Sequence, residues 1–190
     1  AKEVEYSVIN GMAIFEGDIA LGRVEDVEQL SALLQDEFSG SPSRAKGIGL
    51  PSNDLQRGVA ITGARFRWPG GIVPWEVVPS ATRPELRDVV TQAIRHWEAN
   101  TRIRFPERTA ANAARFPNFV SFQVLDGCFS AVGMQGGPQV ISLGVGCGFG
   151  QAVHEIGHAV GLWHEQSRED RDRSVRVRWE NIQPGREHNF

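Results

Sequence analysis

Three histidines and a glutamate lie within the eleven-residue stretch HEIGHAVGLWH, and their spacing suits the binding of one metal ion. His154 and His158 are four residues apart, so on a helix their rings leave one face about 6 Å apart along the axis. Two imidazoles with this spacing can bind a single zinc ion. Gly161 can adopt the positive φ that ends a helix, and the turn brings back His164 as a third ligand. Three neutral imidazoles leave the fourth position of Zn²⁺ open, which is typical of a catalytic site.

Glu155 follows the first of these histidines directly and would lie beside the open position. A carboxylate there can take a proton from an attacking water and pass it to the leaving amine of a cleaved peptide. The alternative is a helix whose histidines are ordinary surface or core residues. Three of the five histidines of the chain fall in this one stretch, which argues against that alternative. The spacing HExxHxxGxxH is the metzincin signature.

The composition excludes several other classes of protein. The chain has 190 residues, of which 41% are hydrophobic and 23% charged, as in an ordinary globular protein. The net charge of −3 lacks the basic excess of a nucleic-acid binder. No apolar run approaches the roughly 18 residues of a membrane helix. We therefore expect neither a nucleic acid nor a membrane as partner.

The elements that would position the site form an α+β pattern. Apolar residues at helical spacing predict helices at about 25–38, 86–100 and 150–160. Short strands are expected at 6–15, 72–78, 102–105, 119–125, 130–134 and 139–143. Pro74 predicts that the strand at 72–78 is an edge or irregular strand. Residues 39–58 are rich in Gly, Ser and Pro and indicate a linker open to proteases.

The stretch after His164 extends the pattern to HExxHxxGxxHExxRxDRD, which closely resembles the astacin family of zinc metalloendopeptidases. The stretches WPGGIVP from Trp68, TRIRF from Thr101 and GCFSAVG from Gly127 also resemble that family. The resemblance implies a zincin-like upper subdomain with a twisted mixed sheet and two long helices. Residues 59–190 would then be the N-terminal part of a catalytic domain that takes protein or peptide substrates.

The family resemblance also implies roles for further residues. Glu165 would interact with the new amino terminus made by activation, not with zinc. The stretch 138–143 would be an edge strand that pairs with extended substrates through Gln139, Val140, Ile141 and Ser142. Cys128 and Cys147, which by composition alone could be free thiols, match one of the two family disulfides. Arg102 stands where the family has a cysteine of the other.

Residues 15–18 read Phe-Glu-Gly-Asp and match the FxGD motif of astacin-family propeptides. The resemblance implies that Asp18 binds the zinc ion in place of water, so that residues 1–58 form an inhibitory propeptide. An activating protease would cut the linker at 39–58, with the mature terminus near Gly58 or Val59. We expect a secreted protein, of bacterial type; the alternative is an effector translocated into a host cell.

The methionine turn and the tyrosine that astacins carry beyond the third histidine are missing from this sequence. Its methionines, Met12 and Met134, and its tyrosine, Tyr6, all precede His154. We therefore expect a fragment, a second chain that completes the cleft, or a degenerate homologue. The rival to an endopeptidase is a non-catalytic, zinc-containing module that binds peptides.

Overall fold

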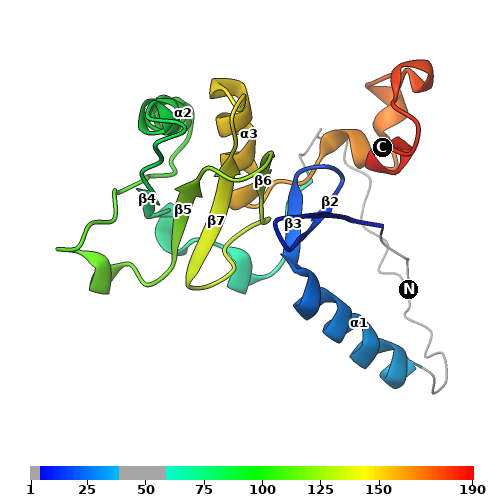
Figure 1. Cartoon of the computed structure of the whole chain (residues 1–190), viewed down its shortest axis with the longest axis horizontal. Helices are drawn as coiled ribbons and strands as arrows, with labels where there is room; N and C mark the ends of the chain where they lie inside the picture. Colours follow the sequence, from blue (N-terminus) through cyan, green and yellow to red (C-terminus); the bar gives the residue numbers. More distant parts are fainter. Residues whose placement is uncertain (1–4, 39–58) are drawn as a thin grey trace.

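The computed structural model describes residues 5–38 and 59–190, where the chain forms one mixed sheet and three longer helices (Figure 1). The strands are β1 (Ser7–Ile9), β2 (Met12–Phe15), β3 (Ile19–Arg23), β4 (Trp75–Val77), β5 (Phe119–Gln123), β6 (Cys128–Ser130) and β7 (Pro138–Leu143). The helices are α1 (Val24–Phe38), α2 (Leu86–Asn100) and α3 (Phe149–Ala159), with single 3-10 turns between the elements and after α3. No helix within the described ranges is long and apolar enough to cross a membrane. The predicted linker at 39–58 lies outside these ranges.

The sheet has the strand order β1-β2-β3-β6-β7-β5-β4. β4, β5 and β7 run parallel to one another, while β6 runs antiparallel to β7. β4 begins directly after Pro74 and is the terminal strand of the sheet, as predicted. This mixed sheet with its helices confirms the predicted α+β fold.

The helices α2 and α3 pack together at the same end of the sheet in Figure 1 and close the main core. The apolar face of α2 buries Val90, Ala93 and Ile94, and Ile156 of α3 is 1% exposed. Two tryptophans add hydrogen bonds to this packing. The indole N–H of Trp68 donates to the carbonyl of Ala159, and that of Trp97 donates to the carbonyl of Val153 on α3. The helix that carries the histidines is therefore fixed on more than one side.

The N-terminal strands continue the sheet of the following residues instead of forming a separate unit. β1, β2 and β3 are antiparallel neighbours, and β3 pairs parallel to β6 at Ile19 and Ser130. Ile14 and Ala20 bury themselves against Phe129 of β6. The sequence predicted one extended stretch at 6–15 and missed β3. The predicted helix at 25–38 is present as α1, which runs away from the sheet (Figure 1).

Two of the expected strands differ from the structure. The stretch at 102–105 makes only a single bridge, between Ile72 and Arg104, and the strand expected at 130–134 is β6, which starts earlier. The glycines at 133, 136 and 137 all have positive φ, which ends regular pairing there.

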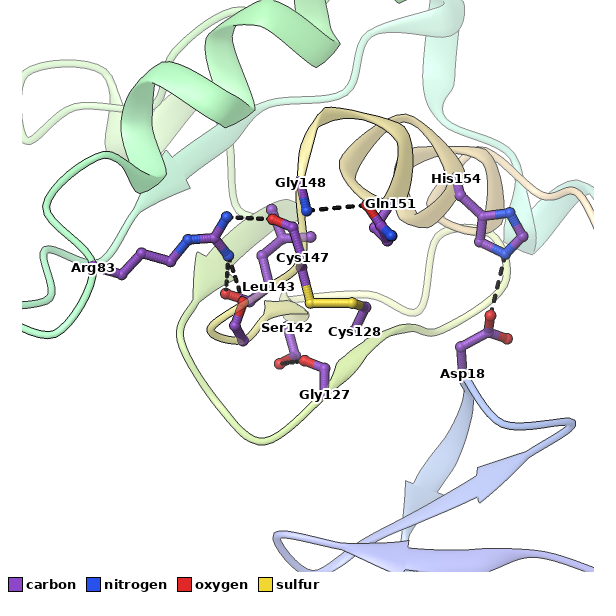
Figure 2. The surroundings of a disulfide bond; sticks show 11 residues. Asp18, Arg83, Gly127, Cys128, Ser142, Leu143, Cys147, Gly148, Gln151 and His154 are labelled. Atoms are coloured by element: carbon purple, nitrogen blue, oxygen red, sulfur yellow. Dashed lines mark hydrogen bonds and ion pairs between the residues drawn. A yellow bond between two sulfur atoms is a disulfide. The ribbon is translucent and has the colours of Figure 1, made fainter. Parts of the chain in front are cut away.

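A disulfide joins Cys128 at the start of β6 to Cys147 in the loop before α3 (Figure 2). A buried arginine supports the same loop. The Arg83 guanidinium is in contact with three carbonyls, donating to Leu143 and Gly144 at 2.6 Å and also to Cys147. Its residue is only 4% exposed. The disulfide and Arg83 together hold the loop that leads into the histidine helix.

Replacing Arg83 by Met is expected to lower the free energy of unfolding by about 3 kcal/mol, because it leaves buried carbonyls without donors. The matched control is Arg95→Met on the exposed face of α2, which should change the free energy by less than about 0.5 kcal/mol. Urea unfolding of the three proteins measures both values. Equal stability of the Arg83 and Arg95 variants would show that the contacts of Arg83 with the three carbonyls do not stabilise the fold.

Candidate metal centre

The helix α3 and the turn after it bring the three predicted histidines together. His154 and His158 leave the same face of α3, with ring centroids 4.6 Å apart. The helix ends where Gly161, at a φ of 115°, donates its N–H to the carbonyl of His158. The chain then returns His164, whose ring centroid lies 4.8 Å from that of His158 and 5.3 Å from that of His154. The expected placement of His154 and His158 on one helix face therefore agrees with the structure, and so does the expected helix end at Gly161.

Asp18 reaches the same point from the turn between β2 and β3. Its backbone is fixed because its carbonyl accepts the N–H of Ser130 at 2.9 Å. Its carboxylate lies 3.2 Å from Nε2 of His154, 3.6 Å from Nε2 of His158 and 2.9 Å from Nε2 of His164. Figure 2 shows the carboxylate facing the His154 ring on α3. The four ligand atoms lie within 4.8 Å of one another.

The hydrogen bonds around this cluster use the outer nitrogens of two histidine rings. The atoms that face the centre of the cluster are then acceptors. Nδ1 of His158 donates to the carbonyl of Leu162 at 2.7 Å, so its Nε2 carries a lone pair. Nδ1 of His164 donates to the carboxylate of Glu16 at 2.9 Å, which leaves its Nε2 as an acceptor 3.3 Å from Nε2 of His154. Among the described residues, Nε2 of His158 and Oδ1 of Asp18 are buried without a hydrogen-bond partner. Converging acceptors of this kind need a cation among them, and three imidazoles with one carboxylate suit zinc.

The charges of the cluster shift two pKa values. Burial alone would raise the pKa of Asp18, but the three imidazoles close to its carboxylate outweigh burial and hold that pKa well below its usual range. Burial acts to lower the pKa of His164, but the nearby carboxylates of Asp18 and Glu16 raise it above its ordinary value. Asp18 is thus a carboxylate, the form that binds metal.

Glu155 lies inside the protein, 1% exposed, and its Oε2 has no hydrogen-bond partner within residues 5–38 and 59–190. Burial, together with the negative charge of Asp18, raises the pKa of Glu155 to about 9. The carboxyl group of Glu155 is therefore buried and close enough to Asp18 for the charge of Asp18 to shift its pKa.

The raised pKa predicts that the metal-free chain loses stability as pH rises. Glu155 titrates near 4.5 in the unfolded chain and about 9 in the folded one, so between these values only the folded state holds the proton. Its contribution is complete below the lower value and is lost towards the upper one, at no more than about 1.4 kcal/mol per pH unit. Urea unfolding from about pH 5 to about pH 9 should show a steeper fall for wild type than for Glu155→Gln. Parallel curves would contradict the assignment.

The prediction that the stretch 138–143 is an edge strand is wrong. β7, with Gln139, Val140, Ile141 and Ser142, lies between β5 and β6 and is hydrogen-bonded on both sides. It therefore offers no free edge to a peptide. Within residues 59–190, β6 is paired with β7 on one side only, and β3 of the N-terminal third pairs with its other side. Gln139, Ile141, Ser142 and Leu143 of β7 are all buried, which fits an internal strand whose two faces are both covered.

Glu165 lies away from the four ligand atoms and contacts the start of the second described range. One of its carboxylate oxygens accepts the backbone N–H of Val59 at 2.6 Å. The same segment is held by Trp163, whose N–H donates to the carbonyl of Val59, and by Ile61, whose N–H donates to the carbonyl of Gly161. Val59 is thus fixed directly beside the turn that carries His164.

Sequence reasoning missed Glu16 and Arg83. Glu16 is part of the FxGD motif but stands at its variable position, so the motif gave it no role. The sequence around Arg83 likewise carries no signal for a buried cation. Both side chains act on partners that are distant in sequence, which only the fold brings near.

A helix that carries histidines and packs against a mixed sheet, with a buried glutamate beside the histidines, is typical of zinc-dependent peptidases. Residues 60–190 match the family profile described as Astacin (Peptidase family M12A). The chain therefore belongs to the astacin family of zinc metalloendopeptidases, and zinc is the metal that its donor set fits.

Individual relatives agree with this assignment. The chain is 38% identical over 180 residues to blastula protease 10 of Paracentrotus lividus, covering 93% of the chain and 27% of that protein. It is 46% identical over 126 residues to tolloid-like protein 2 of Homo sapiens, covering 65% of the chain and 12% of that protein. The chain thus spans about a quarter or less of the length of these relatives. They are animal proteins, so they do not support the expected bacterial source or a translocated effector.

A solved structure shows the same fold. High choriolytic enzyme 1, a hatching enzyme zinc-protease from Oryzias latipes, superposes with a TM-score of 0.57 at 31% identity. The match covers 70% of this chain and 68% of that one.

Proposed function

We propose that this chain is the latent form of a zinc-dependent endopeptidase, in which Asp18 occupies the position that a water needs. The observation that carries the proposal is the carboxylate of Asp18 at the centre of the three imidazoles, 2.9 to 3.6 Å from their Nε2 atoms. Residues 1–58 are the propeptide and residues 59–190 belong to the catalytic domain. Family membership supports the zinc chemistry, and the position of Asp18 supports the latency.

Each residue of the site has one task in this proposal. His154, His158 and His164 hold the zinc ion, and the carbonyl of Leu162 keeps the ring of His158 turned towards it. Zinc, when bound, acts as a Lewis acid that polarises a water and the peptide carbonyl. Glu155 accepts the proton of that water and delivers it to the leaving amine. Removal of Asp18 takes away one of the two causes that raise the pKa of Glu155, which favours its function as a base.

The propeptide blocks substrate as well as water. β3 lies along the edge of β6, and the backbone contact between Ser130 and Asp18 uses an N–H of that edge. An extended peptide substrate would pair with β6 by the same kind of hydrogen bond. The propeptide and the substrate therefore compete for one strand, and β3 must leave before cleavage can begin.

Activation by a protease that cuts within 39–58 would separate the two parts. A cut before Val59 would turn its backbone nitrogen into an ammonium group beside the carboxylate of Glu165, 2.6 Å away in the uncut chain. An ion pair at this place would fix the new terminus next to the turn of His164. The Cys128–Cys147 disulfide supports a secreted enzyme, since such bonds persist in oxidising compartments.

The proposal is tested by assaying zinc content and peptide hydrolysis of the full-length protein before and after limited trypsin treatment. We expect one zinc ion per chain throughout, with hydrolysis appearing only after a cut that leaves a terminus near Val59. Zinc without hydrolysis in the cut protein would favour a module that only binds peptides.

A further inference from the structure

The neighbour of Asp18 in the propeptide, Glu16, also reaches the metal centre. Its carboxylate Oε2 accepts the Nδ1–H of His164 at 2.9 Å, and the side chain is only 11% exposed. The ring of His164 is itself 3% exposed, so this hydrogen bond lies away from bulk water. A buried carboxylate is costly unless it is paired, and here its partner is the imidazole.

The backbone of Glu16 is held in a conformation that side chains rarely adopt. Its φ is 49°, in the left-handed region, and it is followed by Gly17 at 93°. A residue other than glycine, asparagine or aspartate adopts such a conformation only at a cost in free energy. The turn therefore brings the carboxylates of Glu16 and Asp18 to the same histidine, His164. It does so although the backbone conformation of Glu16 is unfavourable.

The two most buried imidazoles obtain their outer hydrogen bonds from different parts of the chain. His158 donates to Leu162, four residues further along the same segment. His164 donates to Glu16, which is 148 residues earlier and lies in the propeptide. An outer carboxylate on a metal-binding histidine fixes its tautomer and makes the ring a stronger ligand. The uncut chain supplies this group to His164, and maturation takes it away.

We propose that Glu16 is a positioning residue that orients His164 and strengthens its hold on zinc in the uncut chain only. The propeptide is then fastened to the metal centre twice, directly through Asp18 and indirectly through Glu16 and the His164 ring. The uncut chain retains zinc more strongly than the mature one, because cleavage removes both carboxylates. This inference rests on the proposed zinc site.

The test compares Glu16→Gln and Glu16→Gly in the zinc-loaded, uncut chain. Glutamine keeps an acceptor oxygen but loses the charge, while glycine relieves the backbone at φ 49° and removes the acceptor. The control is Glu25→Gln, a propeptide carboxylate that is 74% exposed and pairs with Arg23. The rate of zinc loss to a chelator is the readout, together with the ¹⁵N shifts of the His164 ring, which report its tautomer.

Zinc loss is expected to be about 10-fold faster for Glu16→Gln and up to about 100-fold faster for Glu16→Gly, with Glu25→Gln like wild type. After trypsin trimming, all four proteins have the same sequence and must lose zinc at the same rate. If Glu16 only shaped the turn, glycine would be tolerated and its rate would equal that of wild type. Rates within about twofold for both variants would overturn the inference.

The outcome separates this inference from the proposed function. A wild-type chain that binds no zinc would refute the metal centre itself. A wild-type chain that binds zinc and stays latent, but whose Glu16 variants match it in zinc loss and ring tautomer, refutes only the role of Glu16. If Glu16→Gly detaches the propeptide, the uncut variant will hydrolyse peptides. In that case the zinc loss of Glu16→Gln, compared with that of wild type, tests the inference.

Discussion

Replacing Asp18 by Asn is expected to raise peptide hydrolysis by the uncut full-length protein about 10- to 100-fold. The carboxylate contacts all three imidazoles, and loss of hydrogen bonds to a charged group costs about 1.5 to 3 kcal/mol. Asparagine keeps the size of the side chain but is a poor zinc ligand, so water gains access to the metal. Hydrolysis of a fluorogenic peptide by protein with a blocked trypsin site measures the effect.

The control for this experiment is Asp26→Asn, an exposed aspartate in the first turn of α1. It should leave the uncut protein as inactive as wild type. β3 remains on the edge of β6 in both variants, so the activity of Asp18→Asn should stay below that of trimmed protein. An Asp18 variant that is fully latent would show that the strand, and not the carboxylate, blocks the site.

Replacing Glu155 by Gln is expected to lower the hydrolysis rate of the trimmed protein by about 10²- to 10⁴-fold, the range for loss of a general base. The side chain is 1% exposed and its size is preserved, so the fold should tolerate the change. Zinc binding should persist, since Glu155 is not among the four clustered ligands. Hydrolysis and zinc content measured on the same preparation separate the two effects.

A matched control for this variant is Asp126→Asn, an exposed carboxyl near the start of β6. It should keep both the activity and the zinc of wild type. Should Glu155→Gln hydrolyse peptides as fast as the wild-type protein, another group must take the proton. Loss of zinc along with activity would instead mean that Glu155 supports the metal.

The parts of the site that could be predicted from the sequence are those fixed by local geometry. His154, His158 and the turn at Gly161 follow from helix periodicity and from the backbone freedom of glycine, and the structure places them accordingly. The place of Asp18 among the histidines agrees with the role that the FxGD motif implied for it. The helices α2 and α3 could be predicted from the helical spacing of their apolar residues.

The sequence could not show which strands are neighbours, because hydrogen bonds between strands do not depend on the distance along the chain. β7 was therefore taken for an edge, although it is enclosed, and β3 was missed because Gly22 interrupts a strand of only five residues. Glu16 was passed over for the same reason. Its partner His164 is 148 residues away, and no spacing rule links them.

The most direct test of the central claim is anomalous X-ray scattering at the zinc edge from crystals of the uncut, zinc-loaded chain. We predict one peak among the imidazoles of His154, His158 and His164, with the carboxylate of Asp18 as the fourth ligand. A peak held by the histidines while Asp18 lies elsewhere would contradict the proposed latency. Absence of a peak at this site would contradict the metal centre altogether.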